Sequence, residues 1–191
     1  MKRIEALRVI TERTPDLPVT ATCAATSREL AAIADRDNHL YLLDAMGLTV
    51  SVGTGVALAT SDAGVRSVVV DGDGSLLMNL GSAATAGYLQ QPNLVIVLLD
   101  NGVYASTAGI PTQATELDLG GIAESVGLRT LRATDAEELD ARLRRTLDEP
   151  GPWFVHARIE PGNEPGTPPL LIDPVVHADR FRRWLSERIA A

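Results

Sequence analysis

The sequence contains a single cysteine, Cys23, and three widely spaced histidines. One cysteine excludes an internal disulfide framework and a cysteine-rich metal site, and the histidines lack the spacing of metal ligands. No stretch is long and apolar enough to span a membrane, and residues 1–4 lack the apolar core of a signal peptide. These absences lead us to expect a cytoplasmic protein.

Positively charged residues are also scarce. The sequence has 17 Lys and Arg residues against 25 Asp and Glu residues, which gives a net charge of −8. An acidic surface disfavours binding to nucleic acid and to anionic membrane surfaces. A local basic pocket for an anionic substrate remains compatible with this overall balance. We therefore expect neither a nucleic acid nor a membrane as a partner.

The 191 residues suffice for a sizeable core, and 45% of them are apolar. Strand-like and helix-like segments alternate, which predicts an α/β fold with three layers, α/β/α, around a mainly parallel sheet. We expect a single domain over residues 1–191, with a polar flexible run at 102–117 and a loop at 160–169. The expected strands cover residues 19–23, 40–43, 67–71, 94–99, 129–131 and 153–159, and the expected helices cover residues 4–12, 26–34, 50–59, 75–91, 122–126, 135–147 and 173–189.

The most informative motif is Gly72-Asp73-Gly74-Ser75, followed about 25 residues later by Asp100-Asn101-Gly102. Each half of the motif follows a short apolar strand, and the segment between them has helical spacing. The carboxyl ends of parallel strands meet at one edge of the sheet, where open α/β folds bind their ligands. We therefore expect Asp73 and Asn101 to emerge together at that edge.

These residue types suit a hard cation that carries a phosphorylated ligand. Asp73 offers a charged oxygen, Asn101 a neutral one, and a backbone carbonyl just after it adds a third, as Mg²⁺ or Ca²⁺ requires. Glycines beside Asp73 let the backbone approach a phosphate, and Ser75 opens a helix whose free N–H groups favour anions. Two ordinary turns are the alternative, but the pairing of both motifs on strand ends favours the metal site. Gly53-Thr54-Gly55 could suggest a dinucleotide loop, yet the third glycine is missing.

The paired motif resembles the thiamine-diphosphate motif of the decarboxylase and acetolactate-synthase superfamily, whose usual Asn-Asn pair is here Asp100-Asn101. Segments at residues 26–30, 46–47, 99–107 and 159–163 are similar to the β subunits of sulfopyruvate decarboxylases and to phosphonopyruvate decarboxylases. The resemblance covers nearly the whole chain. It implies a thiamine-diphosphate-binding fold of the diphosphate-binding (PP) type, with thiamine diphosphate and Mg²⁺ as cofactors.

The resemblance also implies roles for individual residues. The metal ligands would be Asp73, Asn101 and the backbone carbonyl of Val103. The cofactor would be contacted by Ala24, Ser27, Met46, Gly47, Gly72, Gly74, Ser75, Asn101, Val103 and Tyr104.

Some of these roles have plain alternatives. Ser75 would reach the diphosphate through its hydroxyl, and Met46 would be an apolar wedge under the cofactor, unless it simply packs in the core. Arg28 could face an anionic substrate or serve as a surface ion-pair partner. Ser106 lies with Tyr104 in the segment that should cover the site, and it is our second candidate for substrate contact.

Enzymes of this superfamily also need a glutamate that activates the cofactor, and it lies on a separate pyrimidine-binding domain. The resemblance therefore implies a pyrimidine-binding (α) partner chain and a hetero-oligomer, with residues 50–59 and 160–169 as candidate interface segments. The implied activity is decarboxylation of a small anionic 2-oxo acid, 3-sulfopyruvate foremost and phosphonopyruvate next. Carboligation, as in acetolactate synthases, and a non-catalytic regulatory or interaction module remain alternatives.

The glutamates of this chain have simpler interpretations than catalysis. Glu29 fits a capping box that begins at Thr26. The others under consideration fall on solvated helix faces: Glu116, Glu124, Glu137 and Glu138.

Four positions depart from the family pattern. Ala24 and Asp44 stand where relatives usually carry glycine, Ala45 stands where serine is frequent, and Ala105 replaces another common glycine. Asp44 would place an extra negative charge near a diphosphate. These changes leave the expected metal ligands intact but leave the identity of the substrate open.

Overall fold

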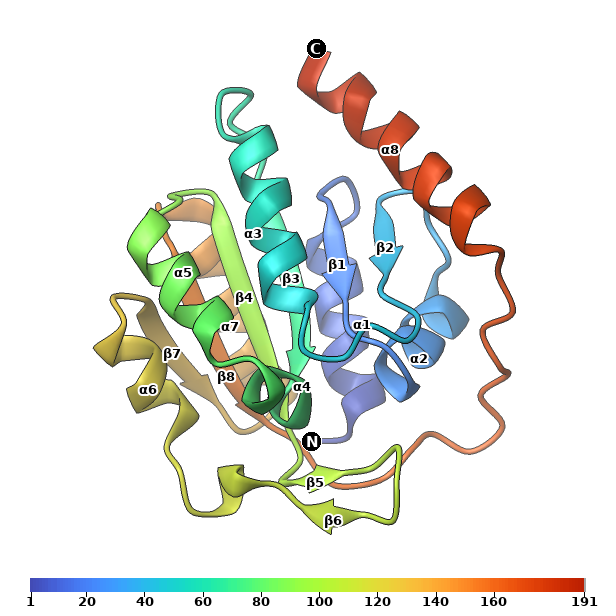
Figure 1. Cartoon of the computed structure of the whole chain (residues 1–191), viewed down its shortest axis with the longest axis vertical. Helices are drawn as coiled ribbons and strands as arrows, with labels where there is room; N and C mark the ends of the chain where they lie inside the picture. The colour runs from blue at the N-terminus through green and yellow to red at the C-terminus, as the bar shows by residue number, and fades with distance from the viewer. Residues whose placement is uncertain (191) are drawn as a thin grey trace.

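A six-stranded parallel sheet forms the centre of the molecule in the computed structural model, which describes residues 1–190 (Figure 1). The strand order is β2-β1-β3-β4-β8-β7. The strands are β1 (Val19–Ala21), β2 (His39–Tyr41), β3 (Ser67–Gly72), β4 (Leu94–Asp100), β7 (Arg129–Ala133) and β8 (Trp153–Arg158). A separate antiparallel hairpin, β5 (Val103–Tyr104) with β6 (Ile110–Pro111), lies beyond the carboxyl end of β4.

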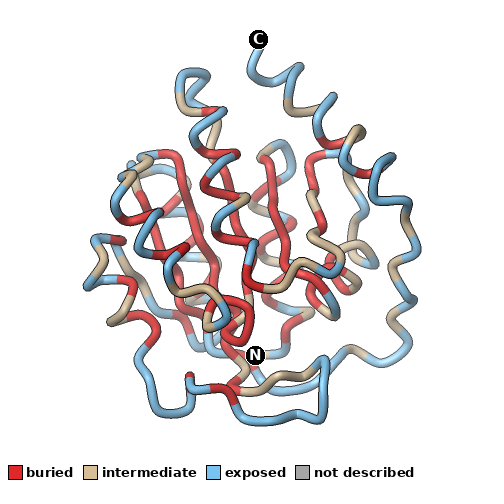
Figure 2. The backbone as a smooth tube through the Cα atoms, viewed as in Figure 1, coloured by how far each residue is buried: buried red, intermediate tan, exposed pale blue. Residues whose placement is uncertain are grey.

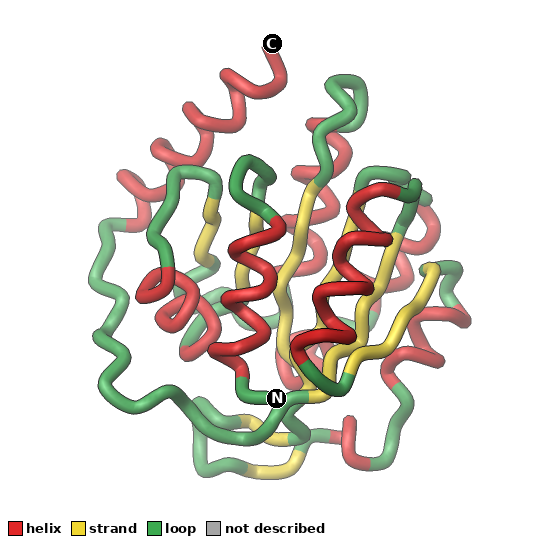
Figure 3. Tube along the Cα trace, turned by 180° about the vertical axis from the view of Figure 1, so that it is seen from behind, coloured by secondary structure: helices red, strands yellow, loops and turns green. Residues whose placement is uncertain are grey.

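Helices cover both faces of this sheet, so the expected three-layer α/β/α architecture is confirmed. One face packs against α1 (Arg3–Arg13), α2 (Ala25–Ile33) and α7 (Ala136–Asp148). The other packs against α3 (Thr49–Thr60), α4 (Asp73–Met78), α5 (Gly81–Leu89) and α6 (Leu119–Ser125). The last helix, α8 (Pro174–Ala190), lies along the β2 edge, and Figure 3 shows the arrangement from behind. None of the helices described within residues 1–190 is both long and apolar enough to cross a bilayer.

The central strands are buried on both faces, which explains why apolar and polar residues do not alternate along them. All seven residues of β4 are buried, and so are the first five residues of β3 (Figure 2). Parallel strands that are covered by helices on both sides read as continuous apolar runs. This is why the short runs of Val, Ile and Leu located these strands correctly in the sequence.

The glycines of α3 have a structural explanation. A Cβ atom on Gly53 would lie 2.1 Å from a methyl carbon of Val69 on β3, so the glycine lets the helix approach the sheet closely. Gly55 faces open space. Both residues lie inside a helix of 12 residues rather than in a loop after a strand, so the dinucleotide-loop alternative is wrong.

The strand order reverses direction between β1 and β3, and this determines where a ligand can bind. From β1 the chain passes through α2 to the outer strand β2, then returns through α3 to β3 on the other side of β1. The connections after β1 and after β3 therefore leave toward opposite faces of the sheet. A crevice opens between them at the carboxyl ends of the strands, which is the usual ligand site of such folds.

Two local expectations are wrong. The predicted helix over residues 75–91 is two helices, because α4 ends at Met78 and α5 begins at Gly81. Between them the Asn79 side chain turns away and donates a hydrogen bond to the backbone oxygen of Gly47 at 3.0 Å. The predicted flexible run at 102–117 also contains regular structure, namely the β5–β6 hairpin and a 3-10 turn at Gln113–Thr115.

Candidate functional site

Two adjoining cavities occupy the crevice at the carboxyl ends of β1, β3 and β4. The smaller has a volume of about 70 Å³. The larger, of about 800 Å³, extends toward the segment that precedes α8. Both are lined by Cys23, Ala24, Met46 and Ser106. We call them the inner cavity and the outer cavity.

The inner cavity brings together most of the residues that the sequence motifs single out. Asp73, at the start of α4, lines it together with Asn101 and Val103, which follow β4. Its wall also includes Ala24, Met46, Gly72, Gly74, Ser75, Tyr104 and Ser106. The parallel pairing of β3 with β4 aligns Gly72 with Leu99, so the two motifs end at the same level of the sheet.

Asp73 and Asn101 are held by hydrogen bonds that fix their oxygen atoms. Asp73 is only 2% exposed, and its Oδ2 accepts a hydrogen bond of 2.5 Å from the Thr112 hydroxyl. The backbone N–H of Asn101 approaches Asp73 Oδ1 at 3.4 Å, and Asn101 Oδ1 accepts from the backbone N–H of Val103 at 3.0 Å. Burial raises the pKa of the Asp73 carboxyl, and the nearby charge of Asp100 adds to the rise. A bound cation would favour the carboxylate form.

The donor set fits a hard divalent cation. It comprises one carboxylate, one amide oxygen and backbone carbonyls, and magnesium prefers such oxygen ligands with some positions left for phosphate and water. No three His, Cys, Asp or Glu side chains gather as metal ligands anywhere in residues 1–190. A site here therefore depends on the amide and backbone oxygens that accompany Asp73.

Glycine is needed at the floor of the inner cavity. A Cβ on Gly74 would lie 2.6 Å from Cε1 of Tyr104, so the tyrosine ring covers this backbone closely. At Gly72 the nearest atom to such a Cβ is the Leu99 oxygen at 4.0 Å, which leaves its backbone open. Gly72 thus provides a backbone that a phosphate can approach, whereas the Gly74 backbone is packed against the Tyr104 ring.

Ser75 lines the inner cavity as expected, and its hydroxyl also has a partner within the protein. Its hydroxyl oxygen accepts a hydrogen bond of 3.0 Å from the Gly47 backbone N–H. It also lies beside Asp71, a carboxyl whose pKa is raised by complete burial and lowered in part by Ser75 and the Gly72 N–H. Ser75 therefore ties the loop that carries Met46 and Gly47 to the start of α4. Gly47 itself lines neither cavity and has a left-handed φ of 86°.

Ala24 has an unusual backbone conformation. Its φ of 61° and ψ of −131° lie in a region that glycine adopts without strain and alanine does not. Ala24 immediately precedes α2 and caps it without any side-chain hydrogen bond. The glycine that the family resemblance leads us to expect at this position would adopt the same backbone without strain.

The outer cavity contains the remaining expected residues. Ser27 and Arg28 line it, as do Asp44 and Ser106. The Ser27 hydroxyl donates to the Thr22 backbone oxygen at 2.5 Å, which is a structural bond. The Arg28 side chain lines this cavity, and its buried Nε has no hydrogen-bond partner among residues 1–190.

The interpretation of Glu29 as a helix cap is wrong. Helix α2 begins at Ala25, one residue before the expected cap. Glu29 is 1% exposed and pairs with the buried Arg3, whose Nη1 lies 2.9 Å from Glu29 Oε1. The same oxygen accepts the Glu164 backbone N–H at 3.0 Å. Glu29 thus fixes the N-terminal helix and the loop after β8 to α2. The interpretation of Glu116, Glu124 and Glu137 as solvated residues agrees with their exposure.

Sequence reasoning missed several residues that support the site. Thr112 lies 39 positions after Asp73, and no local pattern connects them. Asn79 and Asp71 were read as ordinary helix and strand residues. The sequence marks His156 only as an isolated histidine, although its Nε2 lies 2.7 Å from Asp100 Oδ2, one residue before Asn101.

Comparisons with known proteins agree with this arrangement. Residues 22–157 match the family model described as thiamine pyrophosphate enzyme, C-terminal TPP binding domain. The chain is 42% identical over 186 residues to a phosphonopyruvate decarboxylase of Streptomyces viridochromogenes, which covers 96% of this chain and 46% of that protein. It is 41% identical over 181 residues to the sulfopyruvate decarboxylase subunit beta of Methanothermobacter thermautotrophicus, which covers 95% of this chain and 94% of that one.

The fold has solved counterparts as well. The crystal structure of benzoylformate decarboxylase from Polynucleobacter necessarius matches 84% of this chain and 33% of that chain with a TM-score of 0.70, at 18% sequence identity, which shows a common fold. This chain spans about half the length of the Streptomyces relative and nearly all of the archaeal subunit. The chain therefore belongs to the thiamine pyrophosphate enzyme family, in which it corresponds to the C-terminal TPP-binding domain.

Proposed function

We propose that this chain is the diphosphate- and metal-binding subunit of a two-chain, thiamine-diphosphate-dependent 2-oxo-acid decarboxylase. The observation that carries the proposal is the convergence of Asp73 and Asn101 over a glycine backbone in the inner cavity. The match along nearly the full length of an archaeal subunit beta supports the division into two chains.

The residues of this chain would bind and orient the cofactor. Asp73, Asn101 and the Val103 carbonyl would hold Mg²⁺, and the Thr112 hydroxyl keeps the Asp73 carboxylate in place. Met46 lines both cavities and offers an apolar surface between them. When bound, thiamine diphosphate supplies a carbon nucleophile that adds to the keto group and accepts the electron pair left by CO₂.

The group that activates the cofactor would come from a partner chain. No glutamate lines either cavity among residues 1–190. The one buried nearby, Glu29, is occupied by Arg3 and by the Glu164 backbone. A pyrimidine-binding (α) subunit that brings a free carboxyl group to the open side of the crevice would complete the site.

The surface of α3 suits such a partner. The helix has no charged residue over its 12 positions, and Leu58 is 46% exposed on it. An uncharged, partly apolar helix face is typical of a protein interface. The loop at residues 160–169, which is mostly exposed, is the second candidate segment. We propose a hetero-oligomer in which the active site lies between the chains.

The substrate would be a small 2-oxo acid with a second anionic group, most simply 3-sulfopyruvate. Arg28 offers a guanidinium in the lining of the outer cavity, and Ser106 offers a hydroxyl where the two cavities adjoin. Both could bind the distal sulfonate through charge-assisted hydrogen bonds. Phosphonopyruvate is the second candidate, because a phosphonopyruvate decarboxylase is 42% identical. Carboligation of the product to an acceptor is the remaining reaction class.

Binding and turnover by the reconstituted complex test the proposal. We expect Asp73→Ala and Asn101→Ala to abolish Mg²⁺-dependent binding of thiamine diphosphate in calorimetry, because each removes a metal ligand. Asp62→Ala, which removes an exposed carboxylate after α3, is the matched control and should bind normally. Unchanged affinity in both site variants would refute the metal assignment.

The substrate part needs a separate assay. Sulfopyruvate, phosphonopyruvate, pyruvate and a bulky apolar 2-oxo acid are compared as substrates, with and without an acceptor aldehyde. We expect the highest kcat/KM for sulfopyruvate, and a rise in its KM in the Arg28→Met variant. If the apolar acid is preferred, the substrate assignment fails while the cofactor assignment stands.

A further inference from the structure

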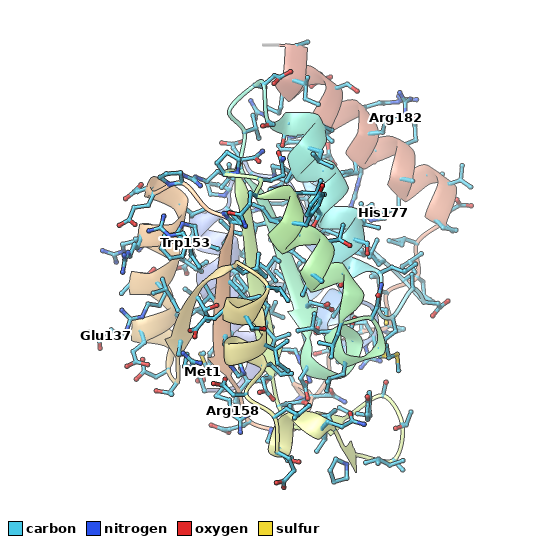
Figure 4. The ribbon with its side chains drawn as sticks, turned by 60° about the vertical axis from the view of Figure 1, so that its left-hand side comes forward. Met1, Glu137, Trp153, Arg158, His177 and Arg182 are labelled. Carbon is cyan, nitrogen blue, oxygen red and sulfur yellow. The ribbon has the colours of Figure 1, made fainter. Side chains whose placement is uncertain are left out.

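The side chains of Asp100, His156 and Arg158 meet directly behind the turn at residues 100–102. The Asp100 carboxylate is buried, and its Oδ2 lies 2.7 Å from His156 Nε2 and 2.5 Å from Arg158 Nη1. His156 is 6% exposed, whereas the Arg158 side chain is 53% exposed, at the end of the sheet near the β5–β6 hairpin (Figure 4). Asp100 immediately precedes Asn101 in the chain. None of the three residues lines the inner or the outer cavity.

The parallel pairing of β4 with β8 creates this cluster. Leu98 is aligned with His156, and Asp100 with Arg158. Side chains two residues apart on a strand point to the same face, so the two basic side chains follow one another along β8. His156 and Arg158 lie on the same face of β8 as the buried Phe154. Arg158 is the last residue of the strand and places a charge at the carboxyl edge of the sheet.

Asp100 connects this pair to the metal ligands. Its second oxygen, Oδ1, accepts the Gly102 backbone N–H at 3.0 Å, which closes the turn around Asn101. Gly102 has a φ of 71°, and its carbonyl oxygen accepts the Thr112 N–H at 2.8 Å. Thr112 in turn donates its hydroxyl to Asp73. One chain of hydrogen bonds therefore runs from β8, across the turn that carries Asn101, to the Asp73 side chain.

A carboxylate suits this position better than an amide does. Asp100 receives two donors on one oxygen and a backbone N–H on the other, and an ionised carboxylate is purely an acceptor. Burial alone would raise the pKa of Asp100, but the bonds from His156 and Arg158 outweigh burial and hold its pKa below the ordinary value. The Asp100 carboxylate is thus matched by two basic residues on β8.

We propose that His156 and Arg158 are positioning residues that act through Asp100 to hold the Asn101 turn in its metal-binding geometry. The inference rests on the proposed function, since it requires Asn101 to bind the metal. Residues that orient metal ligands from behind influence affinity strongly, and their loss typically weakens metal binding by about 10- to 100-fold. A purely structural role in joining β4 to β8 would affect stability instead.

The experiment measures Mg²⁺ and thiamine diphosphate binding to the reconstituted complex, together with thermal stability. We expect His156→Leu to raise the Mg²⁺ concentration for half-saturation by about tenfold or more. His156→Gln, which keeps an N–H donor at a similar reach, should recover most of the affinity. Arg158→Met provides an independent variant that should fold, because its side chain is half exposed.

Arg132→Met is the matched control. Arg132 lies on the neighbouring strand β7, pairs with Asp118 at 2.8 Å and Glu124 at 3.2 Å, and makes no bond to Asp100. Its variant should lose an ion pair without losing metal affinity. If His156→Leu and Arg158→Met bind Mg²⁺ as the wild type does, or lose no more affinity than Arg132→Met, the positioning role is wrong while the proposed function stands. If the wild-type complex itself binds neither Mg²⁺ nor cofactor, both are overturned.

Discussion

Replacing Ala24 with glycine should stabilise this protein, which is unusual for a substitution to glycine. Ala24 holds φ at 61° and ψ at −131°. Such a conformation costs a residue with a side chain about 1–3 kcal/mol. Glycine removes that strain. It also makes the unfolded chain more flexible, which cancels about 0.4–1 kcal/mol of the gain in stability. We therefore expect the free energy of unfolding to rise by about 1 kcal/mol, and Tm by roughly 2–4 °C for a chain of this size.

Urea unfolding and calorimetry of the full chain test this expectation. Ala32→Gly is the matched control, because Ala32 is exposed within the same helix, α2, and has helical geometry. There glycine should lower the free energy of unfolding by about 1 kcal/mol. If Ala24→Gly is as destabilising as Ala32→Gly, the backbone at residue 24 is not strained and our reasoning about this position is refuted.

Three further predictions concern stability and assembly. Burial lowers the pKa of His39 to about 4, so between pH 6.5 and 4 the unfolded chain binds more protons than the folded one. Stability should therefore fall by at most about 3 kcal/mol as the pH falls through this range, and His39→Gln should flatten the dependence measured by urea unfolding. Gly53→Ala should destabilise by about 2 kcal/mol because its Cβ meets Val69, whereas Gly55→Ala should stabilise the same helix by about 1 kcal/mol in the same assay. Leu58→Asp should prevent association with a partner chain in light scattering while the isolated chain keeps its Tm; unchanged association would exclude α3 from the interface.

The two central strands of this fold, β3 and β4, were predictable because each contains a short apolar run. Residues 94–99 contain only Leu, Val and Ile, and the structure buries all of them within β4. The motif after each central strand then located the site, since parallel strands bring their carboxyl ends together. These predictions needed only local composition and one rule of sheet geometry.

The errors arose where a contact between distant residues overrides local preference. The pattern from Thr26 to Glu29 matches a capping box, but Glu29 is drawn into the core by Arg3, 26 residues earlier in the chain. The apolar spacing after Asp73 suits a single helix. The first helix nevertheless ends at Met78, and the side chain of the next residue, Asn79, bonds to the Gly47 backbone oxygen. Local sequence patterns do not contain either partner.

The supporting residues of the site were unpredictable for a related reason. Thr112 reaches Asp73 only because the β5–β6 hairpin returns the chain over the inner cavity. His156 reaches Asp100 only because β8 lies next to β4, an adjacency that depends on the strand order. A motif identifies the groups that touch a ligand, whereas their orientation depends on the topology of the whole sheet.

The residues that line the two cavities are a reason to divide the proposed chemistry between chains. The inner cavity, at about 70 Å³, accommodates a cation with its nearest phosphate oxygens, whereas sites for whole cofactors occupy about 300–1,000 Å³. The rest of a thiamine diphosphate must therefore extend past Met46, where this chain offers apolar residues, Arg28 and Asp44 but no glutamate among the described lining residues. This chain would neutralise and position the diphosphate end, and the activation of the other end would depend on the partner. Loss of Asp73 would then remove cofactor binding, whereas loss of the partner's carboxyl group would leave binding intact and remove turnover.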